Sequence, residues 1–115
     1  MIFVIDDDES MAKCIARACK NETMIFSNAI DAMAEISNGV LPDLIFLDIL
    51  LNGPDGFTFL HELVSYSDTA KIPVVIVSSF DYELKDVAKY GAVGILNKDR
   101  MLPEEIWNYA KEYAE

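Results

Sequence analysis

Short runs of consecutive apolar residues alternate along the chain with stretches in which apolar residues recur every three or four positions. The first pattern is typical of strands buried on both faces of a sheet, and the second of helices with one buried face. The apolar runs predict five strands, at residues 1–5, 24–26, 44–47, 74–77 and 93–96. Because a helix-type stretch follows each strand, we predict a single doubly wound, five-stranded parallel α/β sheet with five helices on its two faces.

Capping residues indicate where the helices begin. Ser10 is expected to cap the first helix, and Ser27 or Asn28 the second, because their side-chain oxygens can accept a hydrogen bond from a free helix N–H. Asp81 or a neighbour is expected to cap the fourth helix. The third, fourth and fifth helices are expected at residues 57–66, 81–90 and 104–114.

The apolar positions of the helices are expected to face the core. They are Met11, Ile15, Ala18 and Cys19 in the first helix, Ile30, Met33, Ala34 and Ile36 in the second, and Phe57, Leu60, Leu63 and Val64 in the third.

The composition fits one ordinary domain, residues 1–115. Nine Lys and Arg residues against 20 Asp and Glu residues give a net charge of −11. So acidic a chain argues against direct nucleic-acid binding, which needs clustered Lys and Arg, and fits contact with cations or basic partner surfaces. The plainer interpretation is that the acidity only keeps the protein soluble. Neither a signal peptide nor an apolar run of the roughly 20 residues that span a bilayer is visible, so we expect a cytoplasmic protein without membrane contact.

Cys14 and Cys19 are the two cysteines, and they lie five residues apart in the first predicted helix. That spacing points them to different sides, so a disulfide between them is not expected. We predict buried or half-buried thiols in a reducing compartment.

Polar residues follow four of the predicted strands. Asp6 and Asp7 follow the first strand, Asp48 the third, Ser78 the fourth and Lys98 the fifth. Each has a plainer explanation, as a turn residue, a strand end, a cap or a surface lysine. The carboxyl ends of parallel strands meet at one edge of a sheet, however, and ligands collect there. The joint placement therefore predicts one functional site.

The residue types indicate the chemistry of this site. Three clustered carboxylates repel one another and need a cation, and a set of oxygen ligands without His or Cys favours Mg²⁺ over zinc. One carboxylate could then attack phosphorus and form an acyl phosphate. The hydroxyl of Ser78 and the ammonium of Lys98 could hold the transferred oxygens, which is most of what phosphoryl transfer requires.

At this point the motifs, in their order, resemble the receiver domains of bacterial response regulators over essentially the whole chain. The resemblance is carried by FVIDD at residues 3–7, PDLIFLD at 42–48, Gly56, IPV at 72–74 leading to Ser78, Gly91-Ala92 and Lys98. It implies a flavodoxin-like strand order of 2-1-3-4-5 and a two-component phosphorelay switch, not an enzyme acting on an external substrate.

The resemblance also implies a role for each site residue. Asp48 would accept the phosphoryl group, while Asp6, Asp7, Asp48 and the backbone carbonyl of Leu50 would hold Mg²⁺. Ser78 would turn toward the phosphoryl group, and Lys98 would pair with it.

The partners implied by the resemblance are proteins. A sensor histidine kinase or phosphotransfer protein would donate the phosphoryl group. A downstream protein target would dock on the surface formed by the fourth helix, fifth strand and fifth helix, through which a homodimer could also form. No direct nucleic-acid binding is expected of this domain.

Four features depart from the family pattern. Ile95 stands where an aromatic residue usually reports phosphorylation, and Asp99 replaces the proline that usually follows the lysine, so no cis bond is expected there. Asn52 stands where proline is common. The segment from Ser78 to Gly91 is about two residues short, which predicts a remodelled start of the fourth helix.

Two other functions compete with a phosphorylation switch. A pseudo-receiver would keep the fold as a phosphorylation-independent interaction module, and Ile95 and Asp99 favour it. A haloacid-dehalogenase type of enzyme also uses an aspartyl nucleophile, but it would normally carry an acid at the position of Leu50. Binding of Mg²⁺ and modification of Asp48 would discriminate between switch and pseudo-receiver.

Overall fold

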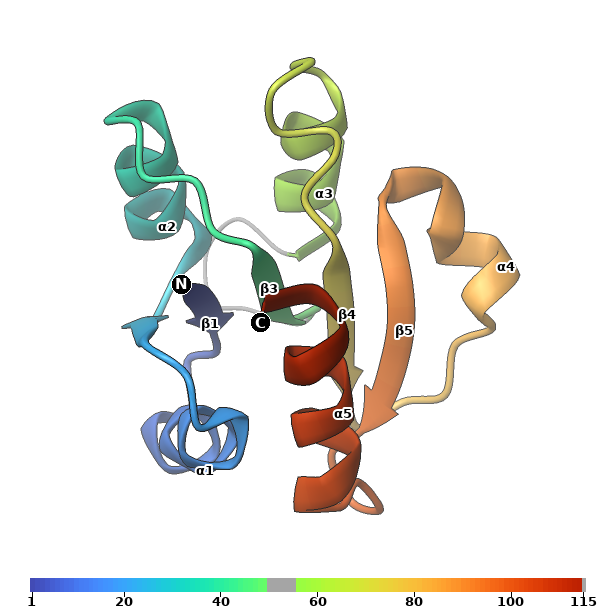
Figure 1. Cartoon of the computed structure of the whole chain (residues 1–115). Helices are drawn as coiled ribbons and strands as arrows, with labels where there is room; N and C mark the ends of the chain where they lie inside the picture. Colours follow the sequence, from blue (N-terminus) through green and yellow to red (C-terminus); the bar gives the residue numbers. More distant parts are fainter. Residues whose placement is uncertain (50–55, 115) are drawn as a thin grey trace.

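All five predicted strands are present in the computed structural model, which describes residues 1–49 and 56–114 (Figure 1). They pair in parallel in the order β2-β1-β3-β4-β5, which confirms the predicted flavodoxin-like arrangement. The strands are β1 (Ile2–Ile5), β2 (Thr23–Phe26), β3 (Leu44–Asp48), β4 (Val74–Ser78) and β5 (Ala92–Asn97).

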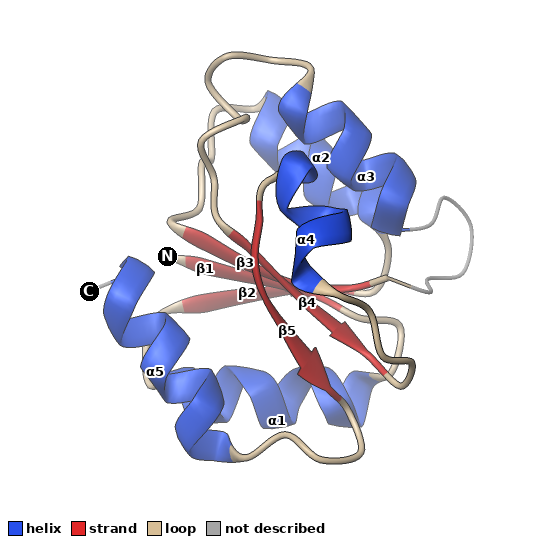
Figure 2. Cartoon of the chain, turned by 90° about the vertical axis from the view of Figure 1, so that its right-hand side faces the viewer, coloured by secondary structure: helices blue, strands red, loops and turns tan. Residues whose placement is uncertain are grey.

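The helices cover both faces of the sheet, as Figure 2 shows. One face is covered by α1 and α5, and the other by α2, α3 and α4. The helices are α1 (Glu9–Cys19), α2 (Ala29–Ser37), α3 (Gly56–Val64), α4 (Leu84–Val87) and α5 (Pro103–Ala114), and a short 3₁₀ helix, η1 (Ala88–Tyr90), follows α4. No helix in the described part of the chain is both long and apolar enough to cross a membrane.

The central strands are buried on both faces, which explains their uninterrupted apolar runs. In β1, Phe3 and Ile5 point to the α2–α3 side, while Ile2 and Val4 pack against α1 and α5. All four side chains are inaccessible to solvent. Alternation along the strand thus divides the core into two layers, and each layer requires an apolar residue at every second position.

Two predicted helix starts differ from the structure: another side chain caps α1, and α4 begins after Glu83 without a side-chain cap. Asp8, not Ser10, caps α1, and its carboxylate accepts a hydrogen bond from Met11 N–H. The fourth helix was expected from Asp81, but it begins at Leu84. The Asp81 carboxylate is engaged elsewhere, with the last residue of β5, Asn97, and with Arg100 in the loop after β5. The predicted cap of α2 at Asn28 is confirmed.

Part of the predicted core face of α2 was also wrong. Ile30 is 62% exposed and Ala34 is also exposed, whereas Ala29, Ala32 and Ile36 are buried against the sheet. The small alanines bring α2 close to the strands, and this turns the larger Ile30 outward. In α1, Cys14 is exposed, contrary to expectation.

The other cysteine and the remaining core positions fit the predicted pattern. Cys19 is buried as predicted, and burial raises the pKa of its thiol to about 12. Ile15, Leu60 and Leu63 are buried as well.

Gly56, the first residue of α3, lies against the strand that carries Asp48. Its N–H donates to the carbonyl of Ile49 at 3.0 Å. A Cβ atom at this position would lie 2.7 Å from the Ile49 Cα and 2.9 Å from the Asp48 carbonyl oxygen. Both contacts are with backbone, so neither can be relieved by a side-chain rotation. The absent side chain therefore lets α3 begin directly beside the end of β3.

Replacing Gly56 with alanine should lower the free energy of unfolding by about 1–3 kcal/mol, because the added methyl group forces the backbone of residues 48–49 to move. Urea denaturation measures this change. Gly39→Ala is the matched control, since it adds a methyl group at a positive φ with no atom within 4 Å. It should cost only about 1 kcal/mol of backbone strain. An equal or smaller loss for Gly56→Ala would contradict the close packing described here.

Candidate functional site

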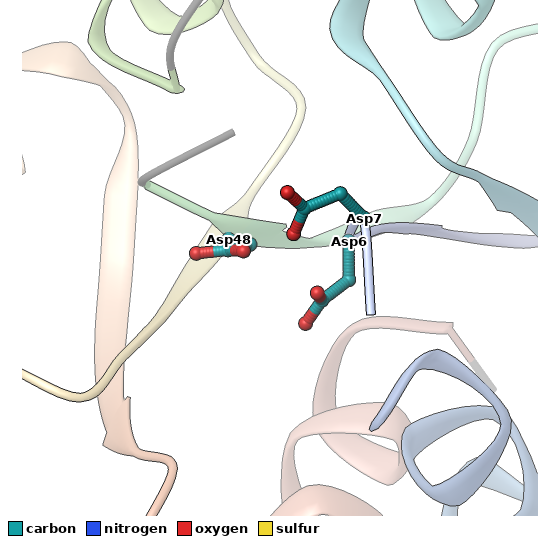
Figure 3. A group of neighbouring side chains, drawn as sticks. All are labelled: Asp6, Asp7 and Asp48. Atoms are coloured by element: carbon teal, nitrogen blue, oxygen red, sulfur yellow. The ribbon is translucent and has the colours of Figure 1, made fainter. Parts of the chain in front are cut away.

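Three aspartates from two neighbouring strands meet at the carboxyl edge of the sheet (Figure 3). Asp6 and Asp7 directly follow β1, and Asp48 is the last residue of β3. Ile5 of β1 pairs with Leu47 of β3, so the two strands deliver their aspartates at the same level. One carboxylate oxygen from each aspartate lies within 4.8 Å of the other two. The structure thus brings together the three acids that the sequence predicted.

Two of these carboxylates are buried, and this makes their charges costly without a cation. Asp6 is 2% and Asp48 4% exposed, whereas Asp7 is exposed. One oxygen of Asp6, Oδ1, accepts a hydrogen bond from the Asp8 N–H at 2.9 Å. The other, Oδ2, is buried and receives no well-aligned hydrogen bond within the described residues, although the Lys98 ammonium is close. This oxygen, whose hydrogen-bonding capacity is not filled, is a position where a cation could also bind.

Lys98 provides the positive charge that the chain itself places in the cluster. Its Nζ lies 3.1 Å from Asp6 Oδ2 and 3.2 Å from Asp48 Oδ2, and its side chain is 15% exposed. Burial alone would lower the pKa of Lys98, but the two carboxylates together outweigh burial and raise the pKa. The ammonium is therefore firmly charged, and with three carboxylates the cluster keeps a net charge of −2.

The donor set fits a hard divalent cation. All the ligand atoms are carboxylate oxygens, and Mg²⁺ prefers such oxygens at about 2.0–2.1 Å. One oxygen from each of the three carboxylates lies within 4.8 Å of the other two, so the three side chains would be the ones to hold such an ion. The remaining expected ligand, the carbonyl of Leu50, lies outside the described residues.

Ser78 reaches the same edge at the end of β4, next to the strand of Asp48. It is buried, and its backbone carbonyl accepts a hydrogen bond from Lys98 N–H at 2.9 Å. Its Oγ accepts a hydrogen bond from the Phe80 N–H at 3.0 Å. In this conformation the hydroxyl oxygen therefore supports the loop that follows β4. A change of rotamer would free it for another acceptor or donor.

The sequence did not predict a polar network beside the site. Asp81 Oδ1 accepts hydrogen bonds from Asn97 Nδ2 at 3.0 Å and from an Arg100 guanidinium nitrogen at 2.6 Å. These contacts join the loop after β4 to the last residue of β5 and to the loop that follows β5, on either side of Lys98. The signal in the sequence was an acid in one loop and a base in the other, but only the strand order shows that these loops are neighbours.

The departures from the family pattern have structural counterparts. The described residues contain no cis peptide bond, as expected from Asp99 after Lys98. Ile95 is half-buried in β5. The short segment after Ser78 leaves α4 only four residues long.

Two groups of ring side chains lie away from the site. His61 lies exposed on α3, with its ring 4.6 Å from that of Tyr90. The aromatic residues of α5 pack against the α1–α5 layer of the core; they are Trp107, Tyr109 and Tyr113.

Comparison with known proteins places this geometry in a family. Residues 2–109 match the model of the response regulator receiver domain. Response regulator PleD from Caulobacter vibrioides is 33% identical over 82 residues, covering 70% of this chain. Sensor histidine kinase CheAY from Helicobacter pylori is 31% identical over 83 residues, covering 68% of the chain. The matched parts make up only 18% and 10% of these two relatives.

A solved structure agrees in fold and in sequence. The Mn²⁺-bound form of response regulator Rcp1 superimposes with a TM-score of 0.74 at 26% identity, covering 96% of this chain and 88% of that one. Because the family model spans nearly the whole chain and the sheet has the order of such receivers, the chain belongs to the response regulator receiver domain family.

Proposed function

We propose that the chain is a phosphorylation switch that accepts a phosphoryl group on Asp48. The observation that carries this proposal is the position of the Lys98 ammonium, 3.1 Å from Asp6 and 3.2 Å from Asp48. A lysine needed only to neutralise a buried acid would require one partner. Here it bridges the proposed nucleophile and a proposed metal ligand, and it can follow the charge as it moves onto a phosphoryl group.

The chemistry is a displacement at phosphorus. A carboxylate oxygen of Asp48 forms a bond to the phosphorus atom of the donor, and the bond from phosphorus to the leaving group breaks with its electron pair. The product is an acyl phosphate, whose charge of roughly −1.5 to −2 replaces the −1 of the carboxylate. Lys98 holds one phosphoryl oxygen. The Ser78 hydroxyl would leave Phe80 N–H and donate to another.

Asp6, Asp7 and Asp48 are proposed to hold Mg²⁺, together with the carbonyl of Leu50. When bound, the ion would neutralise charge on the phosphoryl oxygens. The formal net charge of −2 around Lys98 supports this assignment, as does the Asp6 oxygen that lacks a well-aligned hydrogen bond. The solved Rcp1 structure, named as a Mn²⁺-bound form, shows that a related receiver takes a divalent cation.

The proposed partners follow from the family and from the exposed surface. A histidine kinase or phosphotransfer protein would supply the phosphoryl group. A protein target would dock on α4, β5 and α5, where Leu84 of α4 and Leu102, directly before α5, are exposed. The Asp81 network spans this surface and the site, so it can relay a change at Ser78 without an aromatic residue at Ile95.

A pseudo-receiver is the second candidate, and the single helical turn of α4 favours it. The two candidates differ in whether Asp48 reacts. Incubation with Mg²⁺ and acetyl phosphate should add one phosphoryl group by intact mass, and the gain should vanish with EDTA and in Asp48→Asn. No gain from acetyl phosphate or from a panel of phosphorylated phosphotransfer proteins, with no Mg²⁺ binding by calorimetry, would favour the pseudo-receiver.

Because the carboxylates of the cluster repel one another, removing one of them should stabilise the metal-free protein and at the same time weaken Mg²⁺ binding. Asp7→Asn should raise the free energy of unfolding in EDTA by about 0.5–1 kcal/mol, because it removes one of three like charges and breaks no contact of Lys98. The estimate is small because Asp7 is exposed to solvent. The same substitution should weaken Mg²⁺ binding at least about tenfold.

Thermal unfolding in EDTA and calorimetric titration of Mg²⁺ measure the two effects. Asp43→Asn is the matched control, since this exposed aspartate pairs with the N-terminal ammonium at 2.9 Å. It should not stabilise the protein or change Mg²⁺ affinity. If Asp7→Asn stabilises the protein but leaves its Mg²⁺ affinity unchanged, Asp7 is not a ligand of the metal.

The residues beside the site predict a long-lived acyl phosphate. Phe80 is exposed next to Ser78 and, like Leu50, has no group that can orient an attacking water. The double substitution Leu50→Asn with Phe80→Glu should shorten the lifetime by about tenfold or more, because both new side chains can hold a water. Loss of phosphate after removal of the donor measures the rate. An unchanged rate would contradict this explanation of the lifetime.

A further inference from the structure

The charges of the chain are divided unevenly along the sequence. All nine Lys and Arg residues lie in residues 1–20 or 71–115, so residues 21–70 contain none. These fifty residues carry eight acids, which are Glu22, Asp31, Glu35, Asp43, Asp48, Asp55, Glu62 and Asp68. Both α2 and α3 belong to this part, so these two neighbouring helices carry acids and neither Lys nor Arg.

The outer side of α2 and α3 is hollowed. A depression of about 330 Å³ lies between them, lined mainly by Ile30, Met33, Ala34, Phe59 and Glu62. A second depression of about 390 Å³ shares Met33, Ser37 and Glu62 with the first and continues to Tyr66 and Asp68. Because they share these residues, the two depressions form one groove, called here the α2–α3 groove.

The groove is apolar along its floor and acidic at its edge. Ile30 is 62% exposed at one end and Tyr66 61% exposed at the other, whereas most large apolar side chains of the chain are buried. Glu62 and Asp68 are the charged residues among those that line the groove. Exposed apolar side chains gathered in a groove and bordered by one sign of charge are typical of a protein-binding surface.

We propose that the α2–α3 groove docks a cationic amphipathic helix of a partner protein. Two adjacent helices with a hollow between them fit the apolar stripe of a third helix, and Lys or Arg beside that stripe would meet Glu62 and Asp68. The acidic border disfavours binding of nucleic acid or of an anionic membrane to the groove, because like charges repel. It also disfavours a second copy of this chain, whose net charge is −11.

This surface is separate from the one proposed for the phosphorylated state. Of the two helices that form the groove, α2 packs on β1 and β2, whereas α4 lies beside β5 at the opposite edge of the sheet (Figure 1). A partner held in the groove would therefore leave α4, β5 and α5 free for a second protein. The inference does not depend on phosphorylation of Asp48.

The test uses a synthetic helix of about 14 residues, built only from leucine and lysine, with leucines spaced three and four apart. Titrated into the ¹⁵N-labelled protein with Mg²⁺ in excess, it should shift amide signals of α2 and α3. Ile30→Ser should weaken binding about fivefold or more, because the exposed apolar anchor is lost. The variant should stay folded, since Ile30 is outside the core.

Matched variants distinguish binding of the peptide in the groove from a general attraction between the cationic peptide and the acidic protein. Leu102→Ser removes an equally exposed apolar side chain, at 59%, and should leave the affinity unchanged. Glu62→Gln should weaken binding about twofold, and Glu104→Gln on α5 should not. Four results would overturn the proposal. The first three are no binding, shifts centred outside α2 and α3, and equal losses for Ile30→Ser and Leu102→Ser. The fourth is binding in a parallel titration without Mg²⁺ that excess Mg²⁺ abolishes, because it would place the peptide on the carboxylate cluster.

Discussion

The ion pairs of Lys98 with Asp6 and Asp48 are the interaction on which the carboxyl edge of this sheet depends. At about 3 Å and an effective dielectric constant of about 20, each attraction is on the order of 5 kcal/mol before desolvation. Without it, two buried carboxylates would face each other and Asp7 across the ends of adjacent strands. One lysine offsets this repulsion only in part. The proposed cation and the proposed phosphoryl group would each change that balance, which is why one site would serve both roles.

The backbone around this cluster is arranged to hold the ion pairs in place. The Lys98 N–H donates to the Ser78 carbonyl, so the end of β5 is tied to the end of β4. Gly56 lets α3 begin against the Asp48 carbonyl. Asp81 joins the two loops beside Lys98 through Asn97 and Arg100. Because these links are few and polar, a change in charge at Asp48 can shift loop positions without disturbing the apolar core.

The strands and the acidic cluster could be predicted from the sequence because both follow from strong local patterns. A strand buried on both faces has no polar position, so the apolar runs left few alternatives. A polar residue that directly follows such a run has to emerge at the strand's carboxyl end, which placed Asp6, Asp48 and Lys98 together. The prediction of a functional site was specific only because several strand ends carried polar residues together, since each residue alone had a plainer explanation.

What could not be predicted depends on contacts between distant segments. The side chain of Asp81 was expected to cap a helix, but the strand order offered it Asn97 and Arg100, and α4 begins later as a result. Ile30 fits the apolar spacing of a core position, yet the alanines of α2 fill the space against the sheet. Periodicity identifies an apolar stripe but not which part of a wide stripe faces inward. The stripe on α2 is wider than the core requires, and its unburied part is the end of the groove at Ile30. The apolar part of α2 that the core leaves exposed made the sequence prediction for Ile30 wrong. The same exposed part is the physical reason to expect a partner on this face.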